Sequence, residues 1–416
     1  MRRNSIYYWL VVASMTMALL VVLPEALRMV TQRSQHMVLL SYSHVLGQIG
    51  RLDYTNKDYP LVDKEGRRYT LRETDSIYPL NSFRQLMIDG RMPDSILGQE
   101  ATMRNIAAKQ VITRHDPWDG HDGSLSCGMN ILYENMPKRV GIELPGDLFV
   151  MGDRMEFIGC DDLKVDEKKS VTFTETIKRS GFKFPSLAVW ANNSPRKRYD
   201  NGVFAMDSDS SLFHIMMVNN RPFVRHIEMP WDFHIADMSP FEANDKSIYG
   251  FLFGTDGKVA LLSPADDGGY DVQVFEQANG DISKNRVQIS GNLASWTINV
   301  INDETITAYA YDRNSLKLLD TMVEKRGTTT MVEKVASALV PVHLHVGYRQ
   351  SGKEYVDLEI GDSLGLSWVI AVLIGIAYYG IKGRKRGTRG VVYTVIICLT
   401  GLSGLVAIAL VPKETE

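Results

Sequence analysis

The sequence predicts a membrane-anchored α+β protein, in which three transmembrane helices surround a large exported body. Three observations predict this arrangement: long uncharged apolar segments near both ends, basic residues beside those segments, and alternating apolar residues through the second half of the body. The body is expected to contain a small α/β region, 24–140, followed by an antiparallel β-repeat domain, 141–361, with a propeller-like order of strands.

The predicted transmembrane segments are 6–23, 364–381 and 391–411, none of which contains a charged residue. A hydrocarbon core about 30 Å thick is crossed by about 20 helical residues, and backbone polar groups in lipid must bond within their own segment. The first segment has a cleaved signal peptide as its alternative. Because Pro24-Glu25-Ala26 offers no small-residue cleavage site, we interpret this segment as an uncleaved anchor.

The basic residues predict the orientation of these segments. Arg2 and Arg3 lie in the N-terminal stretch 1–5, and five more basic residues lie in the loop 382–390. Lysine and arginine near span ends stay in the cytoplasm. The body is therefore expected on the periplasmic face of the inner (cytoplasmic) membrane, together with the tail 412–416. This arrangement excludes activities that need an intrinsic cytosolic domain, such as kinase or ATPase activity.

The charge distribution argues against nucleic-acid binding. The whole chain has a net charge of −3, but its two ends are mostly basic, which leaves −9 on the remainder. Nucleic-acid binding requires a basic surface.

A repeat of 47 residues marks the β-rich domain. Its centres are Asp209, Asp256 and Asp303. An apolar residue lies five positions before each aspartate and another lies three positions after it: Phe204 and Leu212, Phe251 and Val259, and Ile298 and Ile306. Each unit is predicted to be a strand, an aspartate-centred turn and a second strand. Several strands per 40–50 residues are typical of propeller blades, and a continuous meander or a sandwich is the alternative.

The segment 114–123 is the strongest candidate for a metal site. It contains five side chains of the kinds that bind zinc or another divalent ion, within eight residues: His115, Asp116, Asp119, His121 and Asp122. A solvated loop rich in aspartate and glycine is the alternative, since the chain contains no HExxH motif. No other cofactor is predicted.

The three cysteines fall in two environments. Cys127 and Cys160 share the exported body, so they are candidates for a disulfide in an oxidising compartment, with two separate buried thiols as the alternative. Cys398 lies in the third apolar segment and is expected to be a packing residue.

Two further patterns are interpreted as structural. Ser194-Pro-Arg-Lys197 has the Ser-x-x-Lys spacing of acyl-transfer enzymes, but the accompanying Lys-Thr-Gly is absent, and Arg196-Lys197-Arg198 is expected to be a solvated basic turn. Trp190, Trp231 and Trp296 lie near the starts of the repeat units and are expected in the core, with a ligand-lining ring as the alternative.

The stretch 82–98, SFRQLMIDGRMPDSILG, resembles a family of membrane proteins from Bacteroidetes-type bacteria that carry a domain of unknown function. The resemblance implies an association with ABC-type transport machinery. It implies no catalytic residues.

These features together favour a non-enzymatic, membrane-anchored periplasmic binding or scaffold subunit. Its expected partners are the lipid bilayer and a membrane permease or other envelope protein. A metal-dependent periplasmic hydrolase using His115 and His121 is the first alternative. A sensor subunit that relays to a separate signalling protein is the second.

Overall fold

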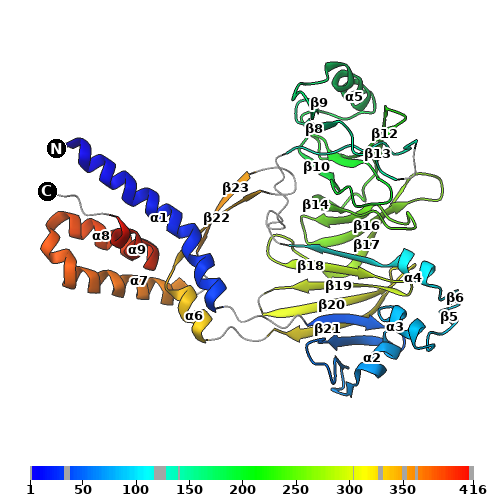
Figure 1. Ribbon diagram of the computed structural model, residues 1–416, viewed down its shortest axis with the longest axis horizontal. Helices are drawn as coiled ribbons and strands as arrows, with labels where there is room; N and C mark the ends of the chain where they lie inside the picture. The colour runs from blue at the N-terminus through cyan, green and yellow to red at the C-terminus, as the bar shows by residue number, and fades with distance from the viewer. Residues whose placement is uncertain are drawn as a thin grey trace. The chain divides into compact units, whose positions relative to one another are not determined.

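The chain folds into two compact units (Figure 1). The computed structural model describes residues 2–31, 38–116, 128–138, 141–302, 304–326, 331–348, 354–360 and 364–411. One unit, which we call the helical unit, comprises Met1–Gln35, Gly327–Gly347 and Glu354–Glu416. The other unit, which we call the body, comprises His36–Arg326 and Tyr348–Lys353.

The helical unit contains five α-helices and one β-hairpin among its described residues. They are α1 (Arg2–Thr31), α6 (Met331–Ala338), β22 (Val342–Tyr348), β23 (Glu354–Ile360), α7 (Leu364–Tyr378), α8 (Gly387–Thr400) and α9 (Leu402–Leu410). A π-helical turn, Tyr379–Gly383, and a 3-10 turn, Arg384–Arg386, connect α7 to α8. Two stretches are long and apolar enough to cross a membrane, Ile6–Thr31 and Gly365–Thr400.

Close glycine contacts show that α7 and α8 form an antiparallel hairpin. A Cβ on Gly375 would lie 2.4 Å from the Sγ of Cys398, and a Cβ on Gly390 would lie 2.0 Å from the carbonyl oxygen of Gly383. These contacts show an antiparallel pairing of α7 with α8 and a packing position for Cys398, although the predicted partner helix 391–411 is divided into α8 and α9. Gly390 leaves no room for a side chain, since the backbone of Gly383 lies against it, whereas a side chain at position 375 would require the Cys398 side chain to move.

The prediction of a third spanning helix over 391–411 is wrong. Gly401 has a left-handed φ of 61° and ends α8 after 14 residues, about 21 Å of helix at 1.5 Å per residue. After Gly401 the chain turns back, so that α9 lies against α8. A Cβ on Gly404 in α9 would be 3.1 Å from a methyl carbon of Ile396 in α8. The break arises at Gly401 because the Leu339 carbonyl oxygen lies 2.5 Å from the position of a Cβ there, and the same oxygen accepts from the Leu402 N–H at 2.9 Å.

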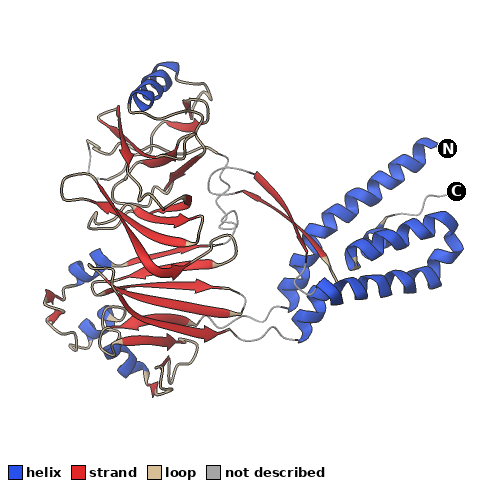
Figure 2. Cartoon of the chain, turned by 180° about the vertical axis from the view of Figure 1, so that it is seen from behind, coloured by secondary structure: helices blue, strands red, loops and turns tan. Residues whose placement is uncertain are grey.

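Three successive antiparallel meanders of four strands each dominate the body (Figures 1 and 2). The first contains β10 (Ala188–Ala191), β11 (Val203–Met206), β12 (Leu212–Val218) and β13 (Arg221–Ile227). The second contains β14 (Ile235–Pro240), β15 (Gly250–Gly254), β16 (Lys258–Pro264) and β17 (Tyr270–Asn279). The third contains β18 (Arg286–Gly291), β19 (Ser295–Ile301), β20 (Thr305–Asp312) and β21 (Leu318–Lys325), and β7 (Val111–His115) extends it at the β18 edge.

The 47-residue repeat corresponds to the central hairpin of each meander. Met206 pairs with Leu212 in the first hairpin, and Phe253 pairs with Val259 at the equivalent positions of the second. In the third hairpin the turn is one residue shorter, and Ile301 pairs with Ile306. Asp303 lies outside the described residues. Within the part of the chain that the structure describes, the sheets do not close into a barrel or propeller.

Smaller elements flank the meanders. A four-stranded sheet contains β1 (Leu39–Ser43), β2 (Gln48–Leu52), β3 (Leu61–Val62) and β4 (Arg68–Tyr69). It is followed by α2 (Leu71–Ile77), α3 (Phe83–Ile88), the hairpin of β5 (Ser95–Ile96) and β6 (Gln99–Glu100), and α4 (Met103–Lys109). The hairpin of β8 (Asp147–Met151) and β9 (Met155–Gly159) packs with α5 (Glu167–Arg179), where Phe157 contacts Phe173 with ring centres 4.7 Å apart.

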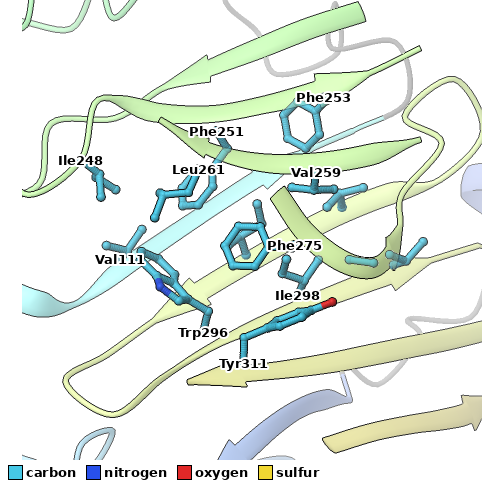
Figure 3. Close-up of a cluster of buried hydrophobic side chains, with 14 of the residues drawn as sticks. Val111, Ile248, Phe251, Phe253, Val259, Leu261, Phe275, Trp296, Ile298 and Tyr311 are labelled. Atoms are coloured by element: carbon cyan, nitrogen blue, oxygen red, sulfur yellow. The ribbon is translucent and has the colours of Figure 1, made fainter. Parts of the chain in front are cut away.

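The core between the second and third meanders is built around Trp296 (Figure 3). Its ring packs edge-on against Phe251 at 5.6 Å, and the Arg313 guanidinium lies 3.8 Å from its centre. Trp190 is also buried, as predicted for a core residue, whereas Trp231 is 92% exposed. The three tryptophans therefore do not form a ring.

Candidate binding site

A cavity of about 450 Å³ lies beside two equivalent connections of the first two meanders. One connection, 192–202, joins β10 to β11, and the other, 241–249, joins β14 to β15. We call this space the Lys197 cavity. Its lining includes Asn192, Arg196, Lys197, Arg198, Tyr199 and Glu242.

Lys197 is a buried ammonium, with 5% of its side chain exposed. Its Nζ donates to the Asn192 carbonyl oxygen at 2.6 Å, to Glu242 Oε1 at 3.0 Å and to Asp200 Oδ1. It also lies 4.8 Å from the centre of the Tyr133 ring. The prediction of a solvated basic turn is therefore wrong for Lys197, because two carboxylates compensate its desolvation, although its two neighbours are exposed.

The two carboxylates of this cluster have further donors. Glu242 Oε2 accepts from Asn192 Nδ2, and Asp200 Oδ2 accepts from the Gly202 N–H at 2.8 Å. Burial raises the pKa of Asp200 to about 6, against the opposing attraction of the Lys197 ammonium. The cluster has a formal charge of −1 with both carboxylates ionised, and protonation of Asp200 in mildly acidic solution removes that charge.

This cluster has the chemistry of a structural clamp. All three donors of Lys197 are engaged, so its ammonium holds the two connections together and offers no free amine for catalysis. Ser194 is exposed, and its Oγ accepts from the Arg196 N–H at 3.2 Å. The Ser-x-x-Lys spacing therefore does not bring a nucleophile and a base together. The Lys197 cavity beside this cluster has the volume of a small-ligand site.

A larger groove of about 610 Å³ runs along α3, the helix that lies within the stretch 82–98. We call it the α3 groove. Its lining includes Leu39, Phe83, Gln85, Ile112 and Gln288, and Arg84 is its one charged lining residue among those that the structure describes. The edge strand β1 lies beside this groove. The backbone carbonyl oxygen of Leu40 in β1 accepts a hydrogen bond from the Asn299 side chain, Nδ2, at 3.0 Å.

A third cavity of about 400 Å³ lies at the opposite turns of the first two meanders. The exposed Trp231 lines it together with His226 and His234. Both histidines are exposed.

His214 is a buried polar residue between the first two meanders. Its Nδ1 lies 2.7 Å from the Tyr270 hydroxyl, and its Nε2 bonds to the Asn201 carbonyl oxygen. Its ring stacks on Phe204 with centres 4.5 Å apart. Burial lowers the pKa of His214 to about 4, so the imidazole is neutral near pH 7. Sequence reasoning missed this residue, because a lone histidine in a strand carries no pairing signal.

The predicted metal ligand His115 is a buried residue at the end of β7. Its ring contacts Phe253 with centres 4.5 Å apart, and its Nε2 lies 3.6 Å from Asp237 Oδ2. Asp237 Oδ1 also accepts from Trp190 Nε1 at 2.5 Å. These side chains connect strands of all three meanders.

Asp116, the second described residue of the predicted metal site, makes ion pairs. Arg114 Nε lies 2.7 Å from Asp116 Oδ2, and Arg286 Nε contacts Asp116 Oδ1. Asp119, His121 and Asp122 lie outside the described residues. Among the residues with described positions, no group of three histidine, cysteine, aspartate or glutamate side chains is arranged to hold a metal ion. The full five-residue site stays a prediction.

The proposed disulfide also stays a prediction. Cys160 follows β9 and is exposed, whereas Cys127 lies outside the described residues. The exposed position of Cys160 contradicts the alternative in which both thiols are buried.

Comparisons with known proteins give the family of the chain. A solved structure of dihydro-heme d1 dehydrogenase NirN in complex with DHE is 9% identical over 67% of this chain and 79% of that chain, with a TM-score of 0.19. No curated protein matches. The model of a domain of unknown function, DUF4857, matches residues 39–311, from β1 through β20, including the Lys197 cavity and the α3 groove. The chain therefore belongs to the DUF4857 family.

Proposed function

We propose that this protein is a non-enzymatic, membrane-anchored binding or scaffold subunit. Its body holds a ligand or partner on the periplasmic side of the inner membrane, and its helices dock on a transport or envelope complex. The resemblance of the stretch 82–98 supports an ABC-type transport complex as that assembly.

The apolar outer surface of the helical unit carries this proposal. Leu10 and Met17 on α1 are 58% and 53% exposed, and Leu373 and Ile376 on α7 are 59% and 61% exposed. The polar contacts lie between helices instead: the Tyr8 and Tyr393 hydroxyls are 2.7 Å apart, and Ser403 Oγ donates to the Leu19 carbonyl oxygen at 3.3 Å. A helix bundle in water carries charged side chains on its outer face. This pattern instead favours contact with lipid or with the apolar helices of a partner.

The basic residues give the proposed orientation. In this proposal, α1 crosses outward from Arg2 and Arg3, and α7 with its π-helical turn crosses inward to the basic segment 382–390. The pair α8 and α9 then enters the membrane and returns to the cytoplasmic side, so this proposal places the tail 412–416 in the cytoplasm instead of the expected periplasm. Two crossings leave the body in the periplasm, in agreement with retention of basic residues in the cytoplasm.

The cavities support a binding role within this proposal. The Lys197 cavity and the α3 groove have the volumes of small-ligand sites. The Lys197 ammonium is neutralised by its partners, and Ser194 has no base beside it among the described residues. No observation on the described residues favours the hydrolase or the sensor.

Co-purification tests the docking role. We compare the tagged full chain with a chain in which 364–416 is replaced by an unrelated transmembrane hairpin, so that both remain in the membrane. A permease or another envelope protein is expected to co-purify with the full chain after cross-linking and to be lost from the replaced chain. Equal recovery of that partner with both chains would contradict docking through α7, α8 and α9.

A further inference from the structure

We propose that the Lys197 cavity binds a phosphate-bearing ligand through the guanidinium groups of Arg196 and Arg198. This inference rests on the binding role proposed above and specifies the chemistry of the ligand. Both arginines are exposed and line the same cavity.

The charges around the cavity favour an anion. The Lys197 ammonium is held by Asp200 and Glu242, and Glu242 is the one acidic residue in the cavity lining that the structure describes. Because Glu242 is 4% exposed at its side chain and bonded to Lys197 and Asn192, it competes little for the arginines.

The neighbouring charged residues do not reverse this balance. Asp245 is paired with Lys109 at 2.6 Å, and Lys246 lies over the Tyr199 ring at 4.8 Å. Neither Arg196 nor Arg198 forms an ion pair with a residue that the structure describes. Arg196 and Arg198 therefore make the mouth of the cavity cationic. The sequence of the body as a whole carries a net negative charge.

Phosphate fits this arrangement better than a carboxylate. Guanidinium groups bind phosphate oxygens in a bidentate manner, and two arginines match the double charge of a phosphate monoester. A volume of about 450 Å³ exceeds that of phosphate alone, so a second part of the ligand has room. Tyr199 and Phe241 supply aromatic walls for it, and Asn244 lines the cavity beside them.

Calorimetric titration of the detergent-solubilised full chain tests this proposal. The probes are inorganic phosphate and phenyl phosphate at pH 7.5. We expect saturable binding of both, with phenyl phosphate tighter because of the aromatic walls. Arg196→Gln combined with Arg198→Gln is expected to weaken binding by about 10-fold or more, since charge-assisted hydrogen bonds are lost. Unchanged melting temperature of this variant shows that the fold persists.

The matched control replaces two exposed arginines away from the cavity lining, Arg104→Gln and Arg179→Gln, and is expected to bind as the parent does. Vesicles of phosphatidylcholine with or without phosphatidic acid, which carries a phosphate monoester, separate the two sources of the phosphate. Binding of phosphatidic acid vesicles that requires Arg196 and Arg198 assigns the site to a lipid headgroup, and binding of phenyl phosphate alone assigns it to a soluble ligand.

Absence of saturable binding, or equal affinity of the cavity variant and its control, would overturn the proposal. Partner co-purification does not depend on these arginines, so failure here leaves the docking test unaffected.

Discussion

Lys197→Met is expected to lower the free energy of unfolding of the body by about 3–5 kcal/mol, because removal of one partner leaves buried carboxylates without their counter-charge. The methionine side chain keeps most of the lysine volume, so the loss reports the ammonium rather than a cavity. Urea unfolding of the detergent-solubilised chain, followed by tryptophan fluorescence at pH 7.5, measures this effect.

Two further variants make this result specific. Arg196→Met, one residue away and exposed, is expected to change stability by less than about 0.5 kcal/mol. Adding Asp200→Asn to Lys197→Met is expected to restore part of the loss, because a neutral amide costs less to bury than an unpaired carboxylate. If Lys197→Met unfolds with the same free energy as the parent, the buried clamp between the two connections does not exist.

His214→Phe is expected to have a strongly pH-dependent effect on stability. The folded pKa of His214 is lowered to about 4 from 6.5, so the unfolded chain binds the proton more tightly. The protein therefore loses stability as the pH falls from about 6.5 to about 4, by about 3 kcal/mol from this residue. Phenylalanine cannot bind a proton, and it leaves the Asn201 carbonyl oxygen and the Tyr270 hydroxyl without their shared partner.

We therefore expect His214→Phe to be clearly less stable than the parent at pH 7, with a deficit that shrinks by about 3 kcal/mol at pH 4. Asp200 acts in the opposite direction, since its raised folded pKa favours the folded state in acid and this contribution is lost as the pH rises toward 6. Both chains retain Asp200, so the difference between their unfolding free energies isolates His214. A deficit that is constant between pH 7 and pH 4 would contradict the lowered pKa of His214.

The repeated hairpins could be predicted because their signal is local. An apolar strand, an aspartate turn and a second apolar strand lie within about ten residues, so Met206 and Leu212 reveal their pairing from spacing alone. Whether the meanders close into a ring depends on contacts between distant units, which spacing does not encode.

The binding site could not be predicted for a related reason. Lys197 is flanked by arginines in the sequence, and its ion pair with Glu242 joins residues 45 positions apart, in the connections of two different sheets. Only Asp200, three positions away, gives a local hint. His214 similarly acquires one hydrogen-bond partner, Tyr270, from the next meander, 56 positions away.

In the helical unit, two helices could be predicted from the sequence and one chain reversal could not. Composition identifies α1 and α7, because the absence of charge over about 18 residues is sufficient evidence for an apolar helix. The reversal at Gly401 depends on the nearby Leu339 carbonyl group, which lies 62 positions earlier in the chain. Hydropathy continues smoothly through that turn and therefore does not reveal it.

Cysteine accessibility tests most directly whether the helices hold the body on the exported face. A chain with Cys127→Ser and Cys398→Ser retains only the exposed Cys160 of the body. A cysteine-free chain with Lys385→Cys reports on the basic segment between α7 and α8. In intact spheroplasts, a membrane-impermeant maleimide is predicted to label Cys160 at once and to label the position 385 variant only after lysis. Labelling of the position 385 variant before lysis, with Cys160 protected until lysis, would contradict the account.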